Sequence, residues 1–139
     1  MKKVLRQTIA IVTGMILAIL LVSGVEVVSN MKHPPPPGSN GTFEEMCELV
    51  RTYPQWLLGA GGIAWCVTAF LSTGLATLIG GRIPGIIVAV VLLAALGFNL
   101  SMLPYVTWFK IVMPIGLMVG CFLGVKLGRL RVHPLGARS

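Results

Sequence analysis

The sequence has few charged residues and very few acidic ones. Of its 139 residues, 11% are charged, and Asp and Glu together number four. The composition is 55% hydrophobic and the mean hydropathy is +0.89, which is more apolar material than a soluble domain of this size can bury. The scarcity of charge therefore argues against an ordinary soluble domain.

The sequence also lacks the patterns of common catalytic, metal and nucleic-acid sites. Its three cysteines show neither CxxC spacing nor a paired framework, so we expect no disulfide and no zinc site. It contains no nucleophile elbow, glycine-rich phosphate loop, HExxH motif or catalytic carboxylate pair. Its basic residues flank apolar segments instead of forming a patch, which argues against nucleic-acid binding. We expect no enzymatic activity, no cofactor and no metal.

What the chain does contain is long apolar runs, of the length that an α-helix needs to cross a hydrocarbon core about 30 Å thick. No alternating pattern typical of a β-barrel appears, and lipid accepts only helices or closed barrels. Four spans are predicted, over residues 4–28, 55–79, 83–103 and 111–127. The connections on either side of the third span are short, so the fold class expected is an all-α membrane protein, an antiparallel four-transmembrane-helix bundle.

The first span has two interpretations. Basic residues followed by an apolar run and by Ser23-Gly24 resemble a cleavable signal peptide. The run is long for that purpose and continues past Glu26, which favours an uncleaved anchor. Cleavage would leave three helices with the same sidedness.

Residues 29–54 form a polar loop, predicted to lie outside the membrane. The prolines at positions 34–37 make a stiff, extended exit from the first span. Thr42 followed by Glu45 matches a capping box, which predicts a short amphipathic helix starting at Phe43. Its apolar side is expected to rest on the bundle or on the headgroups.

Orientation follows from the positions of the basic residues, since Lys and Arg are retained on the cytoplasmic side of a membrane. One side holds eight of them: Lys2, Lys3, Arg6, Arg82, Lys126, Arg129, Arg131 and Arg138. The other side holds three: Lys32, Arg51 and Lys110. Both termini, including the tail at 128–139, are therefore predicted to be cytoplasmic.

Small residues recur every four positions within the predicted spans. In lipid, helices associate largely by close packing through such residues. The clearest series are Gly116, Gly120, Gly124 and Gly128 in the last span and Ser72, Ala76 and Gly80 in the second; the first span has Ala10, Gly14 and Ala18, and the third has Gly97 and Ser101. These faces either assemble one bundle within the chain or present a surface, foremost that of the last span, to a homo-oligomer or a larger membrane complex.

Glu26 and Asn99 form the candidate polar site. Each lies about one turn inside the outer end of its span, at comparable depth, and polar groups within a membrane are costly and often functional. A hydrogen bond between them is geometrically feasible and would be a structural clamp before a transport site, but extension of Glu26 to the headgroups is favoured over a buried role. The hydroxyl residues of the second span are expected to bond to their own helix. The two histidines, His33 and His133, fall on opposite faces and cannot share a metal.

Prolines and aromatic residues flank the predicted spans in a characteristic arrangement. The first span is followed by the proline run and Gly38, and residues 102–104 (Met-Leu-Pro) and Trp108-Phe109 precede the glycine-rich last span. In this arrangement, which covers most of the chain, the sequence resembles a family of uncharacterised small four-helix bacterial inner-membrane proteins. The resemblance implies a four-helix fold in a bacterial inner membrane, and that family has no established activity to transfer.

Two functional hypotheses follow. The first is a non-enzymatic structural or accessory subunit, because the informative residues serve packing and topology and the expected partners are the bilayer and other helices. The alternative is a small transporter or channel, with a polar path past Glu26, Asn99 and the hydroxyls of the second span.

Overall fold

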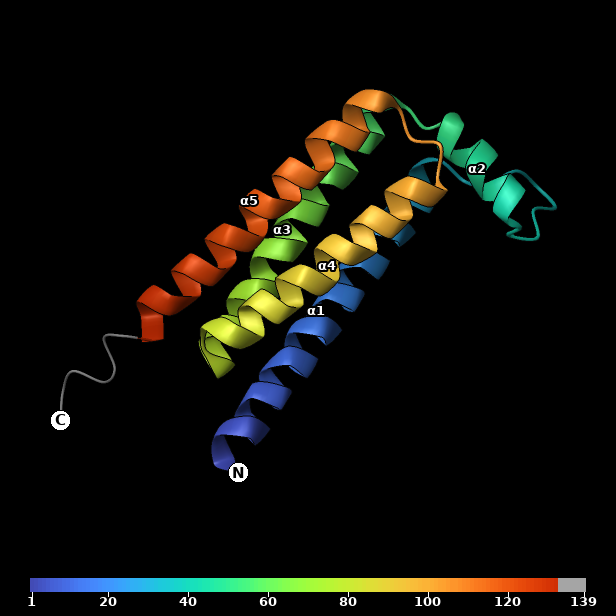
Figure 1. Ribbon diagram of the computed structural model, residues 1–139. Coiled ribbons are helices and arrows are strands. Elements are labelled where there is room, and N and C mark those ends of the chain that lie inside the picture. Colours follow the sequence, from blue (N-terminus) through green and yellow to red (C-terminus); the bar gives the residue numbers. More distant parts are fainter. Residues whose placement is uncertain (133–139) are drawn as a thin grey trace.

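The computed structural model describes residues 1–132, which are helical apart from short connections (Figure 1). Four long helices and one short helix follow one another: α1 (Lys2–Lys32), α2 (Phe43–Arg51), α3 (Gln55–Gly80), α4 (Arg82–Met102) and α5 (Thr107–Val132). The helices α1, α3, α4 and α5 are each long and apolar enough to cross a membrane. The structure thus confirms an all-helical fold with four long apolar helices and one short helix.

The helix α3 lies at the centre of the bundle. It packs against α1, α4 and α5, whereas the backbones of α1 and α5 are not neighbours within the described residues. Figure 1 shows the beginning of α1, the turn between α3 and α4 and the last turns of α5 toward one end of the molecule. We call this the amino end, and the opposite end, which carries α2, the α2 end.

Three helix boundaries differ from the sequence prediction. α1 continues through residues 29–32, assigned above to the outer loop, and ends at Lys32, with His33 as its C-cap just before the proline run. α5 begins at Thr107 and extends to Val132, so it starts before the predicted span and continues into residues 128–132, which were assigned above to the tail. Hydropathy reveals only the part of a helix that could lie in lipid, whereas backbone hydrogen bonding continues beyond it. His133 and Arg138 lie outside the described residues.

A single residue, Gly81, connects α3 to α4. Its φ of +89° is a conformation that side-chain-bearing residues rarely adopt, so glycine permits the one-residue connection between the two helices. Pro84 follows within the first turn of α4, where a missing N–H breaks no helical hydrogen bond. Pro114, by contrast, lies inside α5, where it removes one backbone donor.

The core lies between α3, α4 and α5. Its buried members are Leu58, Ala69, Leu96, Leu100, Phe109, Met113, Leu117 and Cys121. The outward faces of the helices are also apolar: Ile16, Ile63, Val90, Phe98 and Phe122 are each more than 50% exposed. Extensive apolar exposure of this kind is typical of a surface that contacts membrane lipid.

Candidate functional site at the α2 end

The sequence from Ser39 to Glu45 builds a tightly bonded start to α2. The Thr42 hydroxyl accepts a hydrogen bond from the backbone N–H of Glu45 at 3.3 Å, and the Glu45 carboxylate accepts one from the N–H of Thr42 at 3.1 Å. These are the two bonds of the predicted capping box. The N–H of Asn40 and the hydroxyl of Ser39 also donate to the Glu45 carboxylate, each at 3.0 Å.

These hydrogen bonds set the charge of Glu45. The bond from the Thr42 backbone, followed by that from the Ser39 hydroxyl, lowers the pKa of the Glu45 carboxyl from its usual 4.5. Glu45 is therefore ionised at neutral pH and holds a negative charge at the α2 end. A second contact joins the ends of α1 and α2: the ring nitrogen Nε2 of His33, which follows α1, lies 3.1 Å from the hydroxyl oxygen of Thr52, which follows α2.

A cavity of about 500 Å³ lies beneath α2, between the ends of α1 and α4 and the adjoining loops. Its polar lining includes Glu26, Asn30, Ser39, Glu45 and Asn99, and its aromatic lining consists of Tyr53, Trp65 and Tyr105. The two candidate polar residues, Glu26 and Asn99, therefore share this cavity. No hydrogen bond joins them within the described part of the chain.

Sequence reasoning missed two tyrosines of this site, Tyr53 and Tyr105. Each adjoins a proline where a predicted span begins or ends, and this shared position could have placed both at the α2 end. Burial, the charge of Tyr53 and the charge of Glu26 together raise the pKa of Tyr105 to about 12. Burial and then Glu26 also raise the pKa of Tyr53. Both phenols therefore stay protonated at neutral pH and can donate hydrogen bonds.

The cavity lining suits a cationic ligand. Two carboxylates and three aromatic rings line the cavity, and no Lys or Arg side chain is among its lining residues. Carboxylates attract a cation directly, and aromatic faces attract it through the ring quadrupole. A metal ion would need several ligands close together. Residues 1–132 contain no group of three or more His, Cys, Asp or Glu side chains placed to hold a metal.

The hydroxyl residues of α3 do not line this cavity. Thr68, Thr73 and Thr77 are buried, and each hydroxyl donates to the carbonyl four residues earlier, at 2.9, 2.7 and 2.7 Å. Thr73 also lies 3.4 Å from the carbonyl oxygen of Cys121 on α5. Ser72 is fully buried and its hydroxyl has no partner within the described residues. Thr68 reaches a second cavity, of about 280 Å³, which it shares with Glu26 and mostly apolar side chains.

The glycine series of α5 lies against α3. A Cβ atom on Gly120 would approach the Cys66 carbonyl oxygen to 2.6 Å, and one on Gly128 would approach the Gly74 carbonyl oxygen to 2.9 Å. Gly116 likewise meets the Cys66 sulfur, and Gly124 meets the backbone of Phe70 and Gly74. Only glycine lets the two helices come this close, and these contacts lie within one chain.

The second series, on α3, lies mainly against α1. A Cβ atom on Gly14 would be 3.0 Å from both the Ala76 Cβ and the Ser72 carbonyl oxygen, and one on Gly80 would be 2.6 Å from the Ala10 Cβ. Ala10, Gly14 and Ala18 are the buried residues of α1. The central helix therefore meets α1 and α5 through small residues on two of its faces.

Comparison of the chain with protein-family models, with curated proteins and with solved structures gave no match.

Proposed function

We propose that the protein is a non-enzymatic integral membrane protein with a structural or accessory role. In this proposal α1, α3, α4 and α5 cross a bacterial inner membrane as an antiparallel bundle, with both termini in the cytoplasm and α2 outside. The sequence supports this orientation, because eight basic residues fall on the side of the spans predicted to be cytoplasmic and three on the other.

The filling of the bundle interior is the observation that carries this proposal. The contacts of α3 with α1 and α5 are made by small residues, and three of its buried hydroxyls are bonded to its own backbone. Such an interior holds helices together closely but offers few free polar groups to a reactant. A role in assembly is therefore favoured over catalysis.

A small-residue face remains open on α4 and supplies the contact surface in this proposal. Ala94, Gly97 and Ser101 are exposed, and a Cβ atom built on Gly97 meets nothing within 4 Å. Their spacing of three and four residues places them on one side of the helix. The Ser101 hydroxyl donates a hydrogen bond to the Phe98 carbonyl at 2.7 Å, so it needs no partner from another helix. A helix of a second copy or of a partner subunit could approach this face closely.

Purification in mild detergent with crosslinking tests this role. The wild-type protein should be recovered as an oligomer or with a partner, and Gly97→Leu should lose that assembly because leucine blocks the close approach. Gly61→Leu is the matched control, since a Cβ atom at Gly61 also meets nothing within 4 Å but lies on α3. A wild-type protein that is strictly monomeric and free of partners would contradict the proposal.

The cavity at the α2 end favours transport as a second candidate function. Glu26 and Asn99 line one polar space of about 500 Å³, at the depth where a carboxylate could take up a cation from outside. On this hypothesis the protein would pass a cation onward through a rearranged bundle, because the described hydroxyls of α3 are packed between helices.

A flux assay separates the two functions. Wild-type protein in liposomes loaded with a pH-sensitive dye would show proton flux if the second function is right, and Glu26→Gln would abolish it. Glu48→Gln removes the same charge from an exposed position on α2 that does not line the cavity, and it should leave the flux intact. Equal dye responses in empty and protein-containing liposomes would speak against proton transport.

A further inference from the structure

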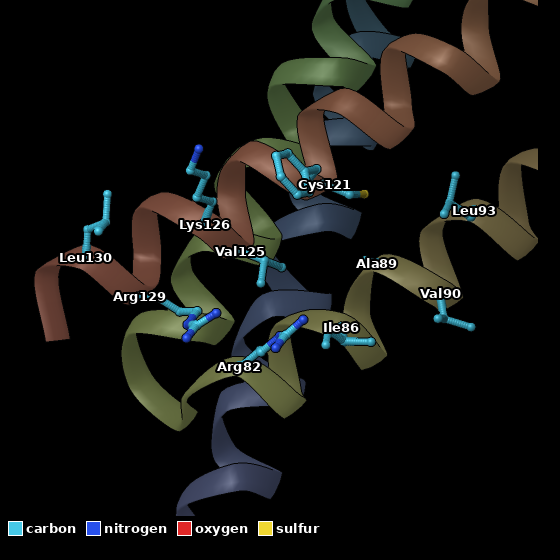
Figure 2. A pocket seen from close by; sticks show the side chains of 11 residues that line it. Arg82, Ile86, Ala89, Val90, Leu93, Cys121, Val125, Lys126, Arg129 and Leu130 are labelled. Carbon is cyan, nitrogen blue, oxygen red and sulfur yellow. The ribbon is translucent and has the colours of Figure 1, made fainter. Parts of the chain in front are cut away.

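A lateral groove lies between α4 and α5 toward the amino end of the bundle (Figure 2). Its volume is about 650 Å³. It plays no part in the cavity beneath α2, since the two share no lining residue. The groove combines a basic end with a long apolar wall.

Two arginines form the basic end. Arg82 is the first residue of α4, and Arg129 belongs to the last turns of α5. In Figure 2 both guanidinium groups extend into the space between these two helices. Lys126 also lines the groove, but its ammonium group lies 5.9 Å from the centre of the Phe122 ring and is directed away from Arg82 in this view.

The positive charge at this end has no acidic side chain beside it. The four acidic residues of the chain are Glu26, Glu44, Glu45 and Glu48, which lie in the α2-end half of α1 or on α2 itself. Two guanidinium groups that share one space repel each other, and an anion placed between them would remove that repulsion and accept their hydrogen bonds. The groove therefore has the charge to bind an anion.

The rest of the groove is apolar. Ile86, Val90 and Leu93 of α4 face Phe122 and Val125 of α5 along it. Arg82 and Leu93 are eleven residues apart, which is about 16 Å along the helix axis. This length matches the hydrocarbon of one leaflet, which is half of a core about 30 Å thick.

We propose that this groove binds an anionic phospholipid of the cytoplasmic leaflet. Its phosphate lies between Arg82 and Arg129, and one acyl chain runs along the apolar wall toward Leu93. The inference rests on the membrane orientation given under the proposed function, which places the amino end at the cytoplasmic surface. A basic site between helices at that depth is suited to a lipid headgroup, whereas a free phosphate ion would leave the apolar wall without an occupant.

The test measures the lipid retained by the full-length protein. Membranes are first washed with alkaline carbonate, and protein from the washed membranes is purified in mild detergent with phosphatidylglycerol or phosphatidylcholine added at equal amounts. Native mass spectrometry then counts the bound lipid. Two arginines near an anionic surface should favour phosphatidylglycerol by about thirtyfold, and millimolar inorganic phosphate should not displace it.

Two variants examine the two parts of the groove. Arg82→Gln with Arg129→Gln should abolish the preference for phosphatidylglycerol. This variant keeps six of the eight basic residues on the side of the spans predicted to be cytoplasmic, against three on the other, so its topology should be unchanged. Ile86→Trp keeps both arginines and fills the apolar wall at a position that is 41% exposed, so it should lower the retention of both lipids. Arg6→Gln is the control, since it removes a charge from the same end without lining the groove.

The outcomes separate this inference from the proposed function. Equal retention of the two lipids by the wild-type protein would overturn the lipid site, as would an unchanged preference in the double arginine variant. Displacement by inorganic phosphate would show an anion site without lipid specificity and would overturn it too. Loss of the protein from carbonate-washed membranes would instead refute membrane insertion, and the lipid site with it.

Discussion

Alanine at position 120 should destabilise the bundle, because α3 and α5 are closest at their glycines. A Cβ atom on Gly120 would lie 2.6 Å from the carbonyl oxygen of Cys66 and 3.4 Å from its carbonyl carbon. These are backbone atoms within α3, which cannot rotate away as a side chain would. The two helices would have to move apart along the face where Gly116 and Gly124 also lie.

The size of the effect follows from two opposing terms. Overpacking of a close contact costs about 1–3 kcal/mol, and the better helix propensity of alanine returns at most ~1 kcal/mol. The difference between these terms lies between ~0 and ~3 kcal/mol, so Gly120→Ala should lower the free energy of unfolding by roughly 1–2 kcal/mol, the middle of that range. Gly97→Ala is the matched control on α4, where a Cβ atom meets nothing within 4 Å, and its stability should be unchanged or slightly higher.

Denaturation by sodium dodecyl sulfate in mixed micelles, followed by circular dichroism, measures both variants against the wild-type protein. The midpoint of Gly120→Ala should fall, and that of Gly97→Ala should not. Equal midpoints for the two variants, or a larger loss for Gly97→Ala, would refute the close packing of α5 on α3.

Two further predictions concern the α2 end. Glu45→Gln should increase hydrogen exchange of residues 43–51, because it removes a carboxylate that accepts bonds from Ser39, Asn40 and Thr42. Because the folded-state pKa of Glu45 is lowered, the carboxylate stabilises α2 fully above the unfolded-state pKa of 4.5, and this stabilisation is lost as the pH falls through the lower folded-state pKa. The hydrogen exchange of wild-type protein and variant should therefore become equal in acid. Wild-type protection that stays above that of the variant in acid would contradict a role for the ionised carboxylate. Tyr105 should ionise with a pKa of about 12 in an absorbance titration. Glu26→Gln should lower that pKa, because it removes a negative charge that opposes formation of the tyrosinate. An unchanged pKa in the variant would place Glu26 away from the cavity.

The short helix shows what local sequence signals can predict. Thr42 and Glu45 are three residues apart, and both bonds of the capping box form within this segment. No distant contact is needed to place its first turn. The long apolar runs predicted four helices for a similar reason, because length and composition are local properties. Helix ends are harder to place from sequence, since residues 29–32 and 128–132 include polar or charged side chains such as Asn30, Lys32 and Arg129 yet continue the helices α1 and α5.

Contacts between distant segments were less accessible to sequence reasoning. The sequence indicates only that Glu26 and Asn99 lie at a similar depth. The structure places both in one cavity, without a hydrogen bond between them. Tyr53 and Tyr105 enter that cavity from connecting segments, and their position depends on how these close over the helix ends. Equally, a repeat of glycines shows that a helix can be approached closely, but it does not specify which neighbour approaches it.

The groove between α4 and α5 depends on the same kind of information. Arg82 and Arg129 belong to different helices, and the sequence alone indicates for each of them only a role in membrane topology. Only the placement of α4 beside α5 brings both to one apolar groove.

Labelling of Cys47 with a membrane-impermeant maleimide tests the four-span orientation most directly. Cys47 lies on α2 and is partly exposed, and a Cys66→Ala, Cys121→Ala background leaves it as the sole thiol. Sealed cells should label Cys47 at once, whereas Ile83→Cys, placed in that background with Cys47→Ala, should be labelled only after the membrane is permeabilised. Ile83 is 60% exposed at the start of α4, so access to it depends on the membrane. Equal labelling of both positions in sealed cells, or recovery of the protein from the aqueous fraction, would contradict the account.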